Sequence, residues 1–183
     1  FCRQSEQIWA KQRNRMRTQP LMVMNDVVPL WMLIGLPGSG KSTWAYNLRA
    51  TLPLSYVSTD QIRGELFGHE AVQGPWDQVW ERVTERLQEA VGATRRGGFS
   101  GAIYDATNTR RRGRRVVIRT AQDLGFTRVV AVWLDTPLEL CLVRNQQRSR
   151  QVPPAVIETM SRQLAGAPPH WEEGFAAIYR LLP

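Results

Sequence analysis

The chain has 183 residues, and 43% of them are hydrophobic, which suits one globular domain with a core of ordinary size. Its longest central apolar run, Val129–Leu134, is far too short to cross a bilayer, and residues 1–20 lack the apolar segment of a secretory signal. We therefore expect no association with a membrane. The two cysteines, Cys2 and Cys141, lack metal-type spacing, so a cytoplasmic, reducing location is expected.

The formal net charge is +8, and the basic residues are arginines apart from Lys11 and Lys41. The planar guanidinium group presents a fork of donors that matches phosphate geometry. This balance favours a nucleic acid as partner. A general compositional bias toward arginine explains it equally well, so the charge supports a polyanionic partner without identifying one.

Residues 1–27 differ from the rest of the chain and are predicted to be a basic N-terminal extension. The stretch from Glu6 to Arg17 could form a basic helix that Gln19-Pro20 would end. Two interpretations stay open for it: a tail without a role, or an arm that contacts nucleic acid. Residues 28–183 are then the folded domain, and the oligomeric state is left open.

From Val28 onward, short apolar runs alternate with helical stretches, as in proteins whose parallel sheet is covered by helices. The predicted strands are 30–34, 54–57, 101–104, 128–134 and 177–182. The predicted helices are 42–51, 61–67, 76–94, 110–124, 137–149 and 154–164. The pattern predicts an α/β fold with a five-stranded parallel sheet between helices. In such folds, ligands bind beyond the carboxyl ends of the strands.

The first predicted strand leads into Gly35–Ser42, which has the P-loop pattern G-x-x-x-x-G-K-S and is followed by a helix. We expect backbone N–H groups of the loop to bind the phosphates of a nucleoside triphosphate. Lys41 would add positive charge at the outer phosphates, and the Ser42 hydroxyl would be a ligand of Mg²⁺. ATP and Mg²⁺ are therefore the expected cofactors. The residues expected around the phosphates are Gly38, Ser39, Gly40, Lys41, Ser42 and Thr43.

The second predicted strand is followed by Ser58-Thr59-Asp60, and Arg63 lies one helical turn beyond Asp60. A carboxylate at this place could accept the proton of an attacking hydroxyl, and the arginine could hold a phosphate of the acceptor. Aspartate is also a good helix N-cap, so spacing alone leaves both interpretations of Asp60 open.

The next predicted helix, 76–94, carries Trp76 and Trp80 on one face, and both are predicted to be core or interdomain contacts. Beyond the third strand, Asp105 could hold a water on Mg²⁺ or orient the acceptor. An arginine run follows at 110, 111, 112, 114 and 115. Cations at a helix start oppose the helix dipole, so the run hints at an anionic partner, although a solvated basic face explains it equally well.

After the fourth predicted strand, Asp135 is interpreted as a cap, and Thr136-Pro137-Leu138-Glu139 as a capping box. Arg144 and Arg148 lie one turn apart on the helix that follows. They could neutralise charge on a transferring phosphoryl group, or simply complement the negative end of the helix.

Together these motifs resemble the polynucleotide 5′-hydroxyl kinase family, over Leu33 to about Leu182. The motifs that carry the resemblance are the P-loop, Ser58-Thr59-Asp60 with Arg63, Asp105-Ala106-Thr107-Asn108, and Arg144-Asn145-x-x-Arg148 followed by Val152-Pro153. The stretch Trp171–Phe175, W-E-E-G-F, is similar to compact ATP-binding relatives of these kinases. The resemblance implies a P-loop kinase fold with an arginine-bearing lid.

The resemblance also implies roles. Asp60 would be the general base on the acceptor 5′-hydroxyl, and Arg63 would contact the neighbouring phosphate of RNA or DNA. Asp105 would assist at the acceptor or the metal-bound water, and Arg144 and Arg148 would be lid arginines beside the nucleotide. An Asp-x-Asp-Gly phosphatase motif is absent from the sequence.

Two alternatives to a polynucleotide kinase stay open. The same fold serves metabolite kinases of the gluconate type, which weakens the polynucleotide as acceptor more than it weakens kinase chemistry. The other alternative is an ATP-binding module without catalytic activity, against which the set of acidic and arginine motifs argues.

Overall fold

A computed structural model describes residues 27–183 of the chain. The predicted basic extension, except for Val27, lies outside the described residues. The strands are β1 Pro29–Ile34, β2 Ser55–Ser58, β3 Ala102–Asp105, β4 Arg128–Leu134 and β5 Ala177–Leu181. The helices are α2 Lys41–Thr51, α3 Thr59–Phe67, α4 Trp76–Arg95, α5 Arg111–Leu124, α6 Leu138–Gln146, α7 Pro154–Gly166 and the 3₁₀ turn η1 Trp171–Glu173.

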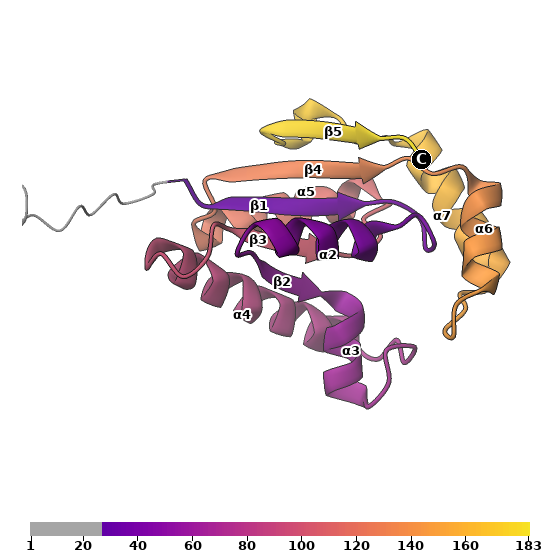
Figure 1. The fold of residues 1–183 in the computed structure, drawn as a ribbon, viewed down its shortest axis with the longest axis horizontal. Helices are drawn as coiled ribbons and strands as arrows, with labels where there is room; N and C mark the ends of the chain where they lie inside the picture. The colour runs from indigo at the N-terminus through magenta and orange to yellow at the C-terminus, as the bar shows by residue number, and fades with distance from the viewer. Residues whose placement is uncertain (1–26) are drawn as a thin grey trace, which may run out of the picture.

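The five strands form one sheet in the order β2-β3-β1-β4-β5, and every pair is parallel. All strands therefore point their carboxyl ends toward the same edge, where α6 and α7 lie (Figure 1). The predicted α/β fold with a five-stranded parallel sheet is confirmed. The edge at which ligands bind in such folds is the one that gathers the sequence motifs.

Two apolar clusters cover the two faces of the sheet. The larger one packs residues of α4 and α5, such as Val83, Leu87 and Ile118, against Leu30 and Met32 of β1. The smaller one packs Ala45 and its neighbours on α2 against the opposite face (Figure 1). Buried parallel strands are apolar on both faces, which is why each strand appears in the sequence as a short continuous apolar run.

A third cluster joins α6 and α7 to the P-loop. Leu36 of the loop packs with Cys141 of α6 and Ile157 of α7, all of them buried. The position of these helices at the carboxyl edge is therefore fixed by apolar contact with the loop itself.

Two predictions for the segment after β4 are wrong, whereas the other predicted elements differ from the structure by at most two residues at their ends. The helix predicted over 137–149 ends as α6 at Gln146, and residues 147–153 form a loop. The capping box predicted at Thr136–Glu139 does not form, because Pro137 is the N-cap and the Thr136 hydroxyl donates to the Ser39 carbonyl at 3.1 Å. Thr136 thus stabilises the P-loop instead of capping α6.

Within residues 27–183, each helix is too short or too polar to span a lipid bilayer.

Candidate active site

The loop between β1 and α2 has the backbone shape that its glycines permit. Gly38 and Gly40 have φ of +83° and +96°, in the left-handed region that favours glycine. A Cβ at Gly38 would also collide with the carbonyl oxygen of Cys141 on α6. The loop therefore lies against α6 and begins α2 directly, which leaves the first N–H groups of that helix available to an anion.

The Lys41 side chain is buried in the mouth of this loop. Its ammonium group donates to the carbonyls of Gly35 at 3.0 Å and Leu36 at 2.7 Å. Burial lowers the pKa of Lys41, and the nearby Asp105 carboxylate opposes part of that shift. Bound phosphates would favour the charged form further, so Lys41 is well placed to meet an anion.

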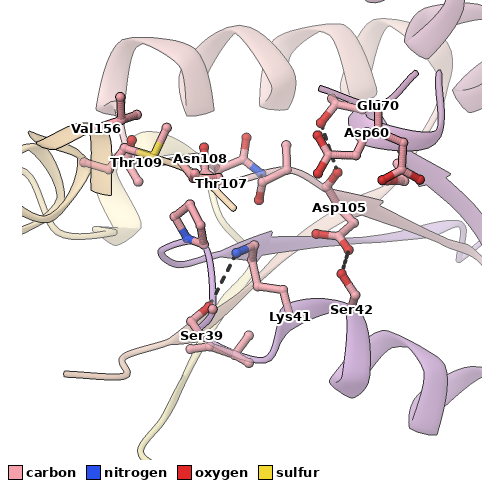
Figure 2. A pocket seen from close by; sticks show the side chains of 18 of the residues that line it. Ser39, Lys41, Ser42, Asp60, Glu70, Asp105, Thr107, Asn108, Thr109 and Val156 are labelled. Atoms are coloured by element: carbon pink, nitrogen blue, oxygen red, sulfur yellow. Dashed lines mark hydrogen bonds between the residues drawn. The ribbon is translucent and has the colours of Figure 1, made fainter. Parts of the chain in front are cut away.

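Asp105 at the end of β3 faces the P-loop. Its Oδ2 accepts a hydrogen bond from the Ser42 hydroxyl at 2.9 Å (Figure 2). The same oxygen accepts a second one from the Tyr56 hydroxyl at 2.6 Å. Burial and the Asp105 charge raise the pKa of Tyr56, so its phenol stays a donor. A hydroxyl and a carboxylate in contact are the oxygen donors that Mg²⁺ prefers.

The segment after Asp105 is tied to the P-loop strand. Asn108, with φ of +50°, donates from its side chain to the Leu33 carbonyl at 2.7 Å, and the Gly35 amide donates to the Thr107 carbonyl at 3.0 Å. Asparagine tolerates the left-handed region better than most residues, which explains its place in the D-A-T-N motif.

Asp60 lies across the cavity from the P-loop, in the first turn of α3. Its Oδ1 contacts Arg63 at 3.0 Å and its Oδ2 contacts Arg150 at 3.0 Å, yet 44% of the side chain remains exposed. Asp60 is not the helix cap, because Ser58 occupies that position and accepts from the Gln61 amide. The purely capping interpretation of Asp60 is therefore wrong.

The predicted lid arginines lie on α6 and on the loop that follows it. Arg144 and Arg148 line the same cavity as Lys41 and Asp60. Asn145 lies between them and is buried. Its side-chain amide binds both the carbonyl and the N–H of Val152, at 2.8 and 2.9 Å. This contact closes the loop that carries Arg148 and Arg150.

All of the sequence-predicted site residues line one open cavity with a volume of about 2450 Å³. The group comprises Gly38, Ser39, Gly40, Lys41, Ser42, Thr43, Asp60, Arg63, Asp105, Arg144 and Arg148. Pockets that bind one drug-sized ligand typically measure about 300–1,000 Å³, so this open cavity is larger than a single such pocket. The arrangement puts a phosphate-binding loop on one wall and a half-exposed carboxylate on the other.

Comparison with known proteins places this site in a family. The family model AAA_33, described as an AAA domain, matches residues 30–167, which is most of the chain. The chain belongs to this AAA-domain family. The match includes the P-loop, both aspartates and the lid arginines, and the α/β P-loop fold with its five parallel strands is the kinase-like form of that architecture.

Solved structures resemble this AAA-domain protein in two groups. A chain in the Pnkp1/Rnl/Hen1 RNA repair complex is 28% identical with a TM-score of 0.62, over 76% of this chain. The present chain spans only 45% of that longer one. A sugar kinase from Janibacter sp. HTCC2649 (19% identity, TM-score 0.52, 85% of both chains) shares the fold. The Deinococcus radiodurans tunicamycin resistance protein shares it as well (20%, 0.53, 83% and 86%).

The arginine run of the AAA-domain protein does not act as one surface. Arg110 and Arg112 line the cavity. Arg114 is fully buried and forms two hydrogen bonds to Glu173, at 2.8 and 2.7 Å, besides donating to four backbone carbonyls. The interpretation of the whole run as a partner-binding face is wrong for Arg114, because its charge is satisfied inside the protein.

Two other sequence-based interpretations are corrected. Asp135 is not a helix cap, since its carboxylate accepts from the Arg180 guanidinium on β5, with the Nε atom at 2.8 Å. Trp76 is not a core residue, because it is 52% exposed and lines the cavity, whereas Trp80 packs against the core as predicted.

Sequence reasoning missed Tyr56, Arg150 and the exposed face of Trp76. Tyr56 lies inside a strand, where tyrosine is ordinary, so no signal was available. Arg150 did carry a signal, because it is the third arginine of Arg144, Arg148 and Arg150 and lies two residues before the Val152-Pro153 boundary.

Proposed function

We propose that the protein transfers the γ-phosphoryl group of ATP to a 5′-hydroxyl end of RNA or DNA. The observation that carries the proposal is the pairing of Lys41 and Asp60 on opposite walls of one cavity, with arginines around both. The similarity to a chain of an RNA repair complex supports a polynucleotide as the acceptor. At the coarser level, family membership and fold support a P-loop phosphotransferase that uses ATP.

On the donor side, the N–H groups of Gly38, Ser39, Gly40 and Thr43 would hold the phosphates of ATP, and Lys41 would bind the outer ones. The fit of Mg²⁺ rests on the contact between the Ser42 hydroxyl and Asp105 at 2.9 Å. In the part of the chain that the structure describes, His, Cys, Asp and Glu do not gather in groups of three or more. Mg²⁺ is usually held by few protein oxygens, together with phosphates and water. When bound, it would neutralise charge on the phosphates.

On the acceptor side, Asp60 would accept the proton of the 5′-hydroxyl as its oxygen attacks the γ-phosphorus. A bond then forms between that oxygen and the phosphorus, and the bond between the γ-phosphorus and the β,γ-bridging oxygen breaks to release ADP. Arg63, which touches Asp60, would bind a phosphate of the acceptor strand. Arg144 and Arg148 would stabilise charge on the transferring group.

Replacing Asp60 tests this assignment. Asp60→Asn keeps the shape of the side chain but weakens its basicity, so transfer of labelled phosphate from ATP to a 5′-hydroxyl oligonucleotide should fall by about 100- to 10,000-fold. Asp123→Asn, at an exposed position on α5 away from the cavity, is the matched control and should retain full activity. Undiminished transfer by Asp60→Asn would exclude Asp60 as the base.

A small-metabolite kinase is the alternative acceptor class, and salt separates it from the proposal. The logarithm of the affinity for a single strand falls linearly with the logarithm of the salt concentration. Each phosphate that the protein neutralises makes this slope steeper by about 0.7. A polynucleotide held by several arginines should therefore show a steep slope and a neutral sugar almost none. ATP binding without turnover in the presence of any acceptor would instead indicate a non-catalytic module.

A further inference from the structure

Two tryptophans at the start of α4 form part of the cavity wall. The rings of Trp76 and Trp80 are stacked, with centroids 6.1 Å apart and planes 22° apart. Trp80 is anchored by the core, because it also meets the ring of Tyr104 edge-on at 6.5 Å. Trp76 therefore rests on a fixed support while half of its surface is open.

The backbone before α4 keeps Trp76 at this place. Gly74 has φ of +56°, and a Cβ there would collide with the ring of Phe67 on α3. The loop from α3 can thus pass close to Phe67 before Pro75 begins α4. The indole is held in place by a packed turn and a long helix. A partner would therefore lose little binding free energy in ordering this side chain.

Arg63 connects this aromatic wall to the proposed general base. Its guanidinium carbon lies 5.9 Å from the centre of the Trp76 ring, and its Nη1 atom contacts Asp60 Oδ1 at 3.0 Å. A single guanidinium group therefore separates the indole from the carboxylate. An acceptor group stacked on Trp76 would therefore lie close to the hydroxyl that reaches Asp60, within the same part of the acceptor.

We propose that Trp76 is the stacking platform for the nucleobase of the acceptor's 5′-terminal nucleotide. The inference rests on the proposed function, since the hydroxyl at Asp60 must belong to that nucleotide. A base is planar and aromatic, and it can cover the exposed part of the indole beside Trp80 and Arg63, whereas the hydroxyl-covered ring of a sugar covers it poorly. The neighbouring arginines complement the phosphates of the same strand.

Stacking is tolerant of sequence, because every base has an aromatic face. The platform therefore predicts a requirement for a base at the 5′ end without a strong preference for its identity. Such an enzyme would act on ends of any sequence and discriminate against an end whose base is missing.

The test compares two 5′-hydroxyl trinucleotides that carry a 3′ fluorophore, one with a normal 5′-terminal nucleotide and one with an abasic analogue there. Affinity is measured by fluorescence anisotropy at fixed salt, separately from phosphoryl transfer. The wild-type protein should bind the normal ligand roughly 5- to 150-fold more tightly. Trp76→Ala should bring this ratio close to one, and Trp76→Phe should restore much of it. Trp171→Ala, which removes a 69% exposed tryptophan outside the cavity, should leave the ratio unchanged.

Equal wild-type affinities for the two ligands, or a ratio that persists in Trp76→Ala, would overturn the platform. These outcomes are separable from the fate of the proposed function. A base-dependent ratio without phosphoryl transfer would sustain the platform and reject the kinase assignment. Equally efficient transfer to both acceptors would sustain the kinase assignment and reject the platform.

Discussion

Asp60 and Asp105 end up in one cavity, but their surroundings suit them to different chemistry. Asp105 is buried, and its Oδ2 atom already accepts from Ser42 and Tyr56. An incoming hydroxyl has little access to a buried carboxylate whose oxygen is already occupied by two donors, which suits Asp105 to holding charge on the donor side. Asp60 is partly open to the cavity, where an incoming hydroxyl can reach it. Under the proposed function, Asp105 would hold charge on the donor side and Asp60 would accept the proton of the acceptor.

Removing the Tyr56 hydroxyl tests how much Asp105 depends on its support. Tyr56→Phe deletes the 2.6 Å hydrogen bond while leaving the ring in place. Partners that orient a metal-binding carboxylate typically contribute about 10- to 100-fold in metal affinity or activity. We expect the Mg²⁺ concentration for half-maximal transfer to rise, or the maximal rate to fall, by that factor. Tyr46→Phe, at a 73% exposed position, is the control, and equal effects in both variants would contradict the role.

The P-loop residues were predictable because the loop backbone demands glycine, and the binding of phosphate and Mg²⁺ demands lysine and serine at a fixed spacing from it. The support from Tyr56 was not, since it depends on strand register. Tyr56 pairs with Ile103 of β3, so its side chain shares a face with Asp105 two residues along. Only the paired sheet brings the phenol to the carboxylate.

At the scale of elements, the loop after α6 decides where the lid arginines lie. A helix predicted through 149 would have placed Arg148 on the same face as Arg144. Instead, Asn145 binds the backbone of Val152 and folds residues 147–151 back, so that Arg150 reaches Asp60. The periodicity of the sequence could not predict this loop, because the pattern of apolar residues does not report a side chain that binds backbone groups seven residues away.

Asn145→Ala should therefore loosen the arginine loop. It leaves the N–H and carbonyl of Val152 without their partner, at a cost of about 1–3 kcal/mol in unfolding free energy. We expect slower phosphoryl transfer and faster tryptic cleavage after Arg148 and Arg150. Gln147→Ala, an exposed change in the same segment, should alter neither. An unchanged cleavage rate in Asn145→Ala would show that other contacts hold the loop.

At the scale of the whole molecule, Arg114 joins parts of the chain that are distant in sequence. It binds the carbonyls of Asn108 and Thr109 after β3, that of Ala167 after α7, and the carboxylate of Glu173 before β5. One buried guanidinium group thus attaches the last strand to the segment that carries Asp105. The sequence shows the arginine run, but it does not show that Arg114 is buried, because its partner Glu173 lies 59 residues later in the chain.

Breaking this pair should destabilise the fold. Glu173→Gln leaves the Arg114 charge buried without a counter-charge, so the unfolding free energy in urea should fall by about 3–5 kcal/mol. Glu85→Gln removes the exposed pair with Arg82 and should cost at most about 1 kcal/mol. A comparable loss in Glu173→Gln and Glu85→Gln would refute the structural role.

The order of the strands distinguishes the centre of the sheet from its border. The strand that carries the nucleotide loop lies at the centre of the sheet, whereas β2, which leads to Asp60, forms the outer edge. Because β2 pairs with β3 alone, changes in this edge strand affect a single strand pairing, whereas α4 is held by the larger apolar cluster. Under the proposed function, the acceptor could change through substitutions at this border, while the central strands and the donor side stay the same.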